Sequence, residues 1–434
     1  MRDSNRLVLL SAAAFLARLG WLMRSPEPCG TDGYYYVVQT ADLAAGEGLH
    51  VPDASWVLQL MGLLGQVLDP VLAVKVGASL LAALCVPAAW FLGDRLERPW
   101  TLALLAAASP TLTHLAGDFP KNLGIVAPAL VLSALLVDRP RGWHWVAVFG
   151  AGLLCATAHR LGAVWVGAAL LGALLSRLSP RLLLGALGLG GIFGLAALLL
   201  PGLLHPADLE RLGGHLGPGL PLAWITLRST HPLQLVELAA PWLLFLLGLW
   251  QARQRRELLV LLVPLGLFLL PAFRTDELDL GYRLALMTPL LAWGLVPKLP
   301  RLAWAWVLAL PWGFDPLEHP DYARFRGLIA RLPERPALLI AHQGINFLYD
   351  HETGDEAMAW APEPELHRAD IGRIAWGVRP GQWPEGTRVV MLDGDYSYLP
   401  EADWEAALPD LPEEVVQDPR NPTVVRPASL TRGR

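Results

Sequence analysis

Long apolar stretches recur along the chain from Arg6 to Phe314, and short polar turns separate them. A helix that crosses a bilayer needs about 20 mostly apolar residues. On that length the pattern predicts about eleven spans, near 6–24, 71–93, 99–116, 120–138, 143–160, 161–176, 181–203, 238–250, 257–272, 282–297 and 301–314. The first stretch carries no small-residue cleavage site, so we interpret it as an uncleaved span.

The segment 25–70 interrupts this row of spans with polar and mixed sequence. Its first part, Asp32–Ala45, predicts a helix that Gly46 and Gly48 end. Its second part, Ser55–Leu68, has apolar residues at helical spacing, which is typical of an amphipathic helix in the membrane interface. We therefore expect two surface helices joined by a turn.

Residues 315–434 contain no stretch long enough to span a membrane and are rich in Pro, Asp, Glu and Trp. Short apolar runs predict strands at Ala337–Ala341, Val389–Leu392 and Val424–Val425, and Tyr322–Leu332 predicts a helix. We expect a small α/β domain at 315–434, after a membrane module that covers residues 1–314.

The composition agrees with a membrane protein. Hydrophobic residues make up 54% of the chain and charged residues 17%, whereas soluble domains carry about 25% charged residues. No basic domain or aromatic-basic stripe is present, so nucleic acid is not an expected partner. Three cysteines, Cys29, Cys85 and Cys155, cannot make a disulfide framework.

Basic residues gather in alternate short turns, and short loops rich in Lys and Arg stay in the cytoplasm. These turns hold Arg2 and Arg6, Arg95 and Arg98, Arg139 and Arg141, Arg177 and Arg181, Arg253, Arg255 and Arg256, and Lys298 and Arg301. The pattern predicts a cytoplasmic N-terminus, with the first outer loop (25–70), the other turns and the region after Phe314 outside. The Arg-, Ala- and Leu-rich sequence suggests a bacterial inner membrane, with the C-terminal domain periplasmic or extracellular.

Two acidic residues lie at span ends on the predicted outer face. Asp32 begins the first helix of the outer loop, and Asp118 stands in the turn between the third and fourth spans. Helix capping would explain either residue alone, because Asp is a favoured N-cap and a carboxylate before Pro120 suits a helix start. A carboxylate at the membrane surface can also act as a general base. Two acids on one face favour a shared site.

Several cations lie on the same outer face, against the positive-inside pattern: Arg18, Lys121, His159, Arg160, Arg274 and Arg283. Ionisable residues within spans are costly and usually pair or serve function. They could reach lipid head groups or pair with Asp276, Glu277 and Asp279. They could also bind an anionic ligand, since Arg offers bidentate contacts to phosphate. Beside the outer acids, they favour sugar transfer from a lipid-linked phosphate, with a carboxylate base and cations on the departing phosphate.

With these residues the chain resembles the GT-C glycosyltransferases, which include the protein O-mannosyltransferases, the lipid A aminoarabinose transferase and the oligosaccharyltransferase catalytic subunit. The resemblance covers the row of spans, Asp32-Gly-Tyr-Tyr-Tyr with the helix that follows, Gly117-Asp-Phe-Pro-Lys-Asn122, and the trailing outer domain. It implies a mainly α, polytopic fold of GT-C type. It also implies an inverting transfer from a polyprenyl-phosphate or pyrophosphate sugar to a hydroxyl of a glycan, lipid or protein.

By this resemblance Asp32 and Asp118 are the expected catalytic acids, and Arg283 is similar to the late-span cation that binds the carrier phosphate. To Arg283 we add Arg160, His159, Lys121 and Arg18 as candidates for the same phosphate. Candidates for other substrate contacts are Tyr34, Tyr35, His50 and His342, although the polar sequence around His342 also suits a strand end and loop.

The resemblance leaves the use of a metal open, because some members need a divalent cation and others do not. Many members have two adjacent acids in the first loop, whereas here Gly33 follows Asp32. If Mg²⁺ or Mn²⁺ takes part, Asp32 and Asp118 are expected to hold it.

Two other functions stay open. A transporter or flippase of lipid-linked saccharides would also need cations for phosphate. Transporters, however, place their substrate residues near the midplane, on broken helices in matching halves. Here the marked acids lie at span ends and no matching halves are visible in the sequence. A non-catalytic scaffold of the envelope would leave the outer acids and cations unexplained.

Overall fold

The computed structural model describes residues 2–30, 32–49, 53–138, 140–177, 232–269, 280–296, 322–330, 337–340, 343–353, 358–359, 388–391 and 415–417. These residues are mainly helical. The chain divides into two compact units. Unit 1 comprises residues 1–24, 54–60 and 75–317, and unit 2 comprises residues 25–53, 61–74 and 318–434.

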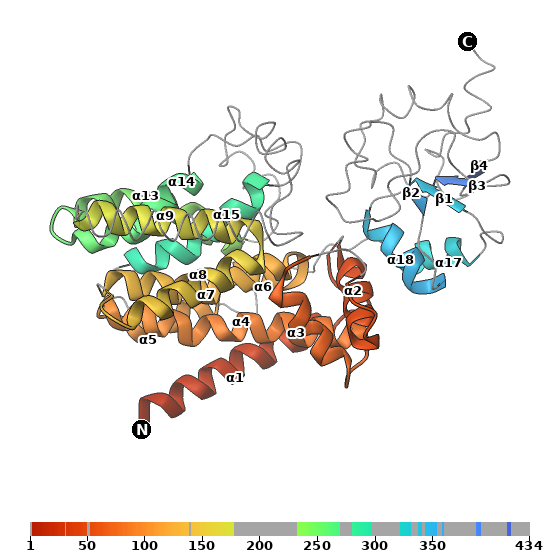
Figure 1. Cartoon of the computed structure of the whole chain (residues 1–434), viewed down its shortest axis with the longest axis horizontal. Helices are drawn as coiled ribbons and strands as arrows, with labels where there is room; N and C mark the ends of the chain where they lie inside the picture. The colour runs from red at the N-terminus through yellow and green to blue at the C-terminus, as the bar shows by residue number, and fades with distance from the viewer. Residues whose placement is uncertain are drawn as a thin grey trace, which may run out of the picture. The chain divides into compact units, whose positions relative to one another are not determined.

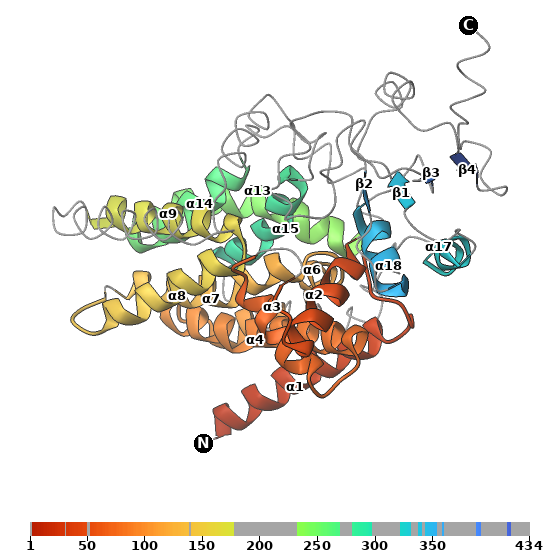
Figure 2. The ribbon, with the colours of Figure 1, turned by 45° about the vertical axis from the view of Figure 1, so that its right-hand side comes forward.

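Unit 1 is a bundle of helices. Its helices are α1 (Arg2–Leu22), most of α4 (Pro70–Arg95), α5 (Pro99–Ala107), α6 (Pro110–Asp118), α7 (Pro120–Val137), α8 (His144–Ala158), α9 (Arg160–Arg177), α13 (Pro232–Ala252), η1 (Arg256–Leu258), α14 (Leu259–Leu269), α15 (Leu280–Ala292) and η2 (Trp293–Leu295). Helices α7, α8 and α9 lie side by side, and α9 also packs along α14 (Figures 1 and 2). The boundary between the units falls within α3 (Trp56–Gly65) and α4.

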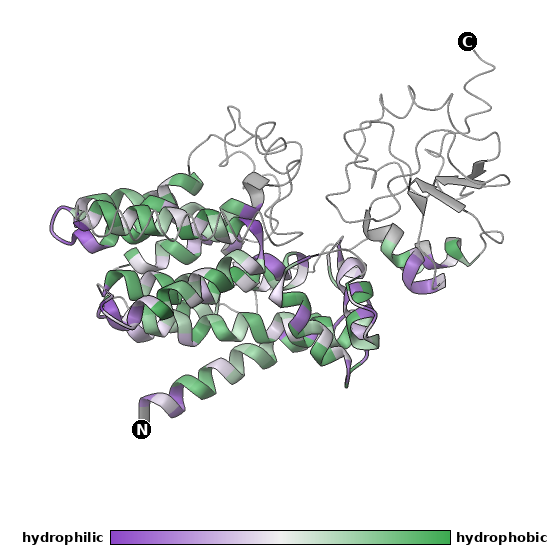
Figure 3. Cartoon of the chain, viewed as in Figure 1, coloured by the Kyte–Doolittle hydropathy of each residue, from purple (hydrophilic) through white to green (hydrophobic). Residues whose placement is uncertain are grey.

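Five helices of unit 1 are long and apolar enough to cross a membrane, by length and composition, among the described residues: Asp3–Leu22, Pro70–Arg95, Pro120–Val137, Arg160–Arg177 and Gln234–Ala252. Shorter apolar helices cover His144–Ala158 and Arg283–Leu295. Apolar residues run along the bundle, and polar residues gather at its turns (Figure 3). These helices indicate a membrane protein. The predicted spans at 181–203 and 301–314 lie outside the described residues, so a total of eleven stays a prediction.

The predicted third span, 99–116, is two helices, α5 and α6, rather than one. The break falls at Pro110, which has no N–H to donate and disfavours helical geometry in the residue before it. Ser109 accordingly has extended backbone angles, and its Oγ accepts the Leu112 N–H at 3.1 Å as the N-cap of α6. The predicted span at 99–116 therefore contains a helix break, which the apolar length alone did not indicate.

Two buried charged side chains satisfy the backbone groups that the break leaves open. Arg18 of α1 is fully buried and donates to the carbonyls of Ala106 at 3.1 Å and Ser109 at 3.3 Å. Glu237 of α13 accepts the Thr111 N–H at 2.9 Å through Oε2. Three segments distant in sequence therefore meet at the break.

Unit 2 contains the first outer loop and the C-terminal region. Its main helices are α2 (Gly33–Ala45), α17 (Tyr322–Ile329) and α18 (Gln343–Thr353), and α18 packs against both α2 and α17. Helix α2 ends at Gly46, which has a left-handed φ of 81° and returns its N–H to Leu43 O at 3.2 Å. The prediction of a helix that ends at Gly46 is thereby confirmed.

Unit 2 also holds four short parallel strands, β1 (Ala337–Ile340), β2 (Met358–Ala359), β3 (Arg388–Met391) and β4 (Val415–Gln417), in the order β2-β1-β3-β4. Strand β1 lies between β2 and β3, with Ile340 opposite Met391. The runs expected at 337–341 and 389–392 coincide with β1 and β3. The predicted strand at 424–425 and the predicted boundary at 314/315 lie outside the described residues.

Candidate functional site

Several helices of unit 1 begin or end near the predicted outer turns. Helix α6 ends at Asp118 and α7 begins at Pro120, with only Phe119 between them. Because Phe119 precedes a proline, it leaves the helical region, with φ −135° and ψ 59°. This one-residue turn fixes Asp118 at the last position of α6 and places Lys121 in the first turn of α7.

The Asp118 carboxylate faces its own helix. His114 lies one turn earlier, and its Nε2 is 3.2 Å from Asp118 Oδ2, with both side chains 21% exposed. The cap residue of α7 is Phe119, without a side-chain capping hydrogen bond. Asp118 is therefore the partner of His114 rather than a helix cap. Sequence reasoning missed His114, although the spacing of four residues places it on the same helix face as Asp118.

His159 occupies the break between α8 and α9 with extended backbone, φ −163° and ψ 154°. Its Nδ1 accepts the Leu161 N–H at 3.2 Å, which places the ring proton on Nε2. Burial lowers the pKa of His159 well below its usual range, and the charges of Lys121, Arg283 and Arg160 lower it further. His159 is thus a neutral N–H donor beside three cations.

Ser55 and Trp56, in the second part of the first outer loop, hold the end of α8 in place. Ser55 Oγ donates to the Ala158 carbonyl at 2.8 Å, and Trp56 Nε1 donates to the Leu154 carbonyl at 2.9 Å. Carbonyls at a helix end have no partner within the helix. The bond from Ser55 satisfies one of them, at the residue directly before His159.

Arg283, on the first turns of α15, reaches the α6–α7 turn. Its guanidinium lies over the Phe119 ring, 4.6 Å from the centroid. This is cation–π geometry. Its Nε is buried and has no hydrogen-bond partner in the described part of the chain. We name Lys121, His159, Arg160 and Arg283 the outer cation cluster, because the charges of the other three all act on His159.

Arg18 lies in a different environment from the outer cation cluster. Its guanidinium is fully buried and is directed at the carbonyls of the α5–α6 break. Those contacts satisfy backbone, so its described partners are protein groups rather than a surface open to a ligand.

Asp32 lies in unit 2, at the N-cap position of α2. Its side chain makes no capping hydrogen bond, and its Oδ1 is buried without a hydrogen-bond partner among the described residues. The turn that carries it is closed by the Gly33 N–H, which donates to the Gly30 carbonyl at 3.2 Å. Capping therefore does not explain this acid.

Tyr34 and Tyr35 are buried within unit 2. The Tyr34 hydroxyl donates to Glu27 at 2.6 Å, and the Tyr35 hydroxyl donates to Asp53 at 3.2 Å. Burial raises the pKa of both phenols, and the neighbouring carboxylates raise it further. Both hydroxyls thus support the first outer loop. His50 and His342 lie outside the described residues.

The described residues contain no group of three His, Cys, Asp or Glu side chains that could hold a metal ion. Asp32 and Asp118 belong to different units. The expectation that these two acids would hold a divalent cation stays a prediction.

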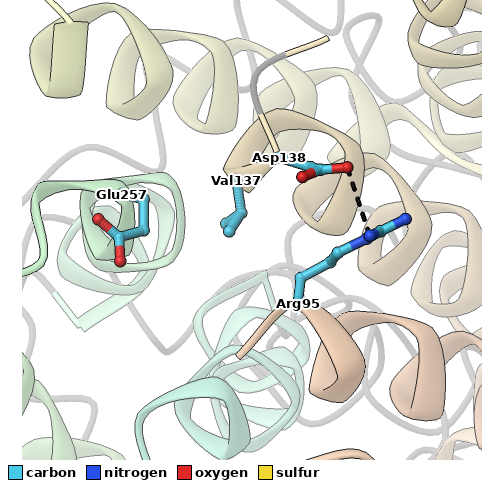
Figure 4. A pocket seen from close by; sticks show the side chains of 4 residues that line it. All are labelled: Arg95, Val137, Asp138 and Glu257. Atoms are coloured by element: carbon cyan, nitrogen blue, oxygen red, sulfur yellow. Dashed lines mark ion pairs between the residues drawn. The ribbon is translucent and has the colours of Figure 1, made fainter. Parts of the chain in front are cut away.

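A pocket of about 260 Å³ opens at the predicted cytoplasmic end of unit 1, lined by Arg95, Val137, Asp138 and Glu257 (Figure 4). Arg95 and Asp138 form an ion pair at 3.4 Å, and Glu257 pairs with Arg255 at 2.8 Å. These charged residues lie at helix ends and are partly exposed to solvent. Their ion pairs stabilise the turns between the helices. The pocket contains none of the residues predicted from the sequence to form the functional site.

No protein-family model matches the chain, and no curated protein matches it. The function must therefore be argued from the residues and their geometry.

Proposed function

We propose that the chain is a membrane glycosyltransferase of GT-C type, with about eleven spans and a small α/β domain outside the membrane. It would move a sugar from a polyprenyl-phosphate or pyrophosphate donor to an acceptor hydroxyl on the outer face of a bacterial inner membrane. One observation carries this proposal: His159, whose Nδ1 accepts the Leu161 N–H, stands at the break between α8 and α9, with Lys121, Arg160 and Arg283 near enough for their charges to act on it.

The outer cation cluster suits a phosphate that gains charge during the reaction. Arg283 offers a planar fork of N–H donors, Lys121 and Arg160 add positive charge, and neutral His159 adds one N–H. As the glycosidic bond breaks, its electron pair goes to the phosphate oxygen. Cations already fixed in place stabilise that charge without reorganising.

The acceptor needs a base, because a neutral hydroxyl is a weak nucleophile. Asp32 would take the hydroxyl proton as the acceptor oxygen attacks the anomeric carbon, which inverts the configuration. The absence of a capping bond leaves its carboxylate available for this role. Asp118 would be the second acid, and His114 holds its carboxylate.

A transporter of lipid-linked saccharides is the second candidate, and one observation favours it. The α5–α6 break lies on a broken helix with two buried charged side chains, Arg18 and Glu237, which is a feature of transporter sites. Binding without chemistry would separate this candidate from a transferase.

The decisive experiment is a transfer assay in nanodiscs with a panel of polyprenyl-phosphate and pyrophosphate sugars, with and without Mg²⁺ or Mn²⁺. We expect wild type to consume one donor and Asp32→Asn to lose turnover while it keeps donor affinity. If Asp32→Asn consumed the donor at the wild-type rate, Asp32 would not be the base. Tight donor binding without turnover, across a panel of acceptors, would favour the transporter.

Arg283→Ala tests the phosphate assignment directly. We expect its affinity for the polyprenyl phosphate to fall about 10-fold or more, because a charge-assisted contact contributes about 1.5–3 kcal/mol. Arg24→Ala is the matched control, since Arg24 is an exposed arginine on the same predicted face and outside the cluster. Equal affinity for Arg283→Ala and Arg24→Ala would contradict the assignment.

A further inference from the structure

Helix α17 is attached to the turn that carries Asp32. The Tyr322 hydroxyl donates to the Gly30 carbonyl at 2.6 Å, and the Gly33 N–H donates to the same oxygen. Gly30 has a positive φ of 75°, a conformation that glycine adopts readily. One carbonyl thus joins the turn at 30–33 to the C-terminal region.

Arg326, one turn after Tyr322 on α17, fixes the chain before that turn. Its two terminal nitrogens donate to the Glu27 carboxylate at 2.6 and 3.0 Å, a bidentate contact. Its Nε donates to Glu352 of α18 at 2.7 Å, which holds the guanidinium from the other side. The pKa of Arg326 is raised by these carboxylates, so it stays charged throughout the physiological range.

The same arginine also fixes the chain after the turn. It donates to the Tyr34 hydroxyl at 2.5 Å, while Tyr34 donates to Glu27. The Tyr34 ring meets the Tyr322 ring edge to face at 4.9 Å. The chain is therefore held at Glu27 and Gly30 before Asp32 and at Tyr34 after it, whereas the Asp32 carboxylate makes no capping bond.

We propose that Tyr322 and Arg326 are positioning residues for Asp32, so that the C-terminal region sets the geometry of the proposed base. This inference rests on the proposed function. A mutation far from the chemistry that displaces a reacting group by about 1 Å can lower the rate about 100-fold. This positioning role would also explain why a transferase of GT-C type carries a C-terminal region outside the membrane.

The test compares Tyr322→Phe with wild type as the full chain in nanodiscs. The variant keeps the ring against Tyr34 and loses the hydrogen bond to Gly30. We expect kcat to fall about 10- to 100-fold, with KM for the donor and the thermal unfolding midpoint unchanged. Arg326→Lys should act in the same direction, because one ammonium cannot reproduce the bidentate contact.

Tyr349→Phe is the matched control, since it removes the hydroxyl of another buried tyrosine of unit 2, on α18, that takes no part in the contacts described above. We expect its kcat to stay at the wild-type level. Wild-type kcat in Tyr322→Phe would overturn the proposal. Equal losses of kcat in Tyr322→Phe and Tyr349→Phe, together with a lower unfolding midpoint, would also overturn it and assign a purely structural role.

A second measurement keeps this proposal distinct from the proposed function. Amide hydrogen exchange should become faster at residues 30–33 in Tyr322→Phe, whether or not a sugar is transferred. Unchanged exchange would show that the hydroxyl does not restrain the turn and would overturn the inference. If wild type showed this restraint but transferred no sugar, the proposed function would fail, and the role assigned to Asp32 would fail with it.

Discussion

His159 differs from the other members of the outer cation cluster because it carries no charge. Its Nδ1 is occupied by the Leu161 N–H, and a second ring proton would add a fourth positive charge to the site. A neutral donor lets the site contact a phosphate through one more N–H without raising the repulsion among its cations. As a consequence, acid is expected to lower the stability of the folded chain.

The first prediction concerns that sensitivity. The pKa of His159 is lowered in the folded chain, so below about pH 6.5 the unfolded chain binds a proton that the folded chain refuses. Stability is therefore present above that pH and lost below it, by at most about 1.4 kcal/mol per pH unit. His159→Gln should lose less of its free energy of unfolding than wild type between about pH 7.5 and about pH 5.5. Parallel pH curves would contradict the prediction.

The residues of the candidate site were predictable to different degrees. Asp118 stands out as an acid at a span end on the same predicted face as Asp32, and its neighbouring cations stand out because they go against the positive-inside pattern. His114 carries a local signal, its spacing of four residues from Asp118, that the search for acids overlooked. The contact of Arg326 with Glu27 joins residues 299 positions apart. No periodicity or local motif encodes such a contact.

Helices of unit 1 approach closely where glycine removes a side chain. A Cβ on Gly172 of α9 would collide with the Leu259 carbonyl at the start of α14. Small residues allow such backbone approach in membrane bundles. The contact between α9 and α14 thus depends on one missing methyl group.

Gly172→Ala should accordingly lower the free energy of unfolding by about 1–3 kcal/mol, the usual effect of overpacking. Gly167→Ala on the same helix is the control, since no atom lies within 4 Å of the added Cβ there. That variant should be neutral or slightly stabilising, because alanine is the better helix former. Unfolding in detergent micelles, followed by tryptophan fluorescence, measures both. Equal effects of the two variants would show that packing on α14 is not limiting.

The α5–α6 break makes a second prediction at the scale of elements. Glu237→Ala leaves the buried Thr111 N–H without its acceptor and should cost about 1–3 kcal/mol of stability. Gln234→Leu, one turn earlier on α13, should cost little, because its Nε2 has no partner in the described structure. The same unfolding assay applies. A stable Glu237→Ala protein would mean that water replaces the carboxylate.

Helix α2 was predictable because the residues that end it, Gly46 and Gly48, directly follow it in the sequence. The break at α5–α6 also has a local signature, Ser109 at the N-cap followed by Pro110 at the first helical position. It was overlooked because a continuous apolar length dominates the prediction of spans. The side chains that stabilise the break come from α1 and α13, and no local pattern announces them.

At the scale of the whole molecule, the alternating charges make a prediction of orientation. After Ala replaces the three buried cysteines, an impermeant maleimide should label Glu47→Cys in intact cells, because residue 47 lies in the predicted outer loop. Arg141→Cys should be labelled only after the cells are permeabilised. Both positions are exposed, so access rather than burial decides the outcome. Labelling of Arg141→Cys but not Glu47→Cys in intact cells would show the opposite orientation, and the proposed site would then not lie on the outer face.

Charge distribution follows the membrane and can be read along the sequence, whereas the grouping of the first outer loop with the C-terminal region cannot. Residues 25–53 and 61–70 of the loop belong to the same compact unit as residues from 318 onward. Its contacts, such as Tyr322 with Gly30, span 292 residues. The sequence therefore predicts which segments lie outside but not which of them pack together.

The buried arginine of α1 also bears on the order in which the chain is made. Arg18 leaves the ribosome early, but the carbonyls that accept its hydrogen bonds follow 88 and 91 residues later, and Glu237 about 220 residues later. At roughly 5–20 residues per second, the carboxylate arrives on the order of 10 to 40 s after the arginine. An arginine at the centre of a lone span costs roughly 2.5–3.5 kcal/mol on insertion. Arg18 therefore waits for the α5–α6 break before its guanidinium finds these acceptors, and α13 completes the surroundings of the break later still.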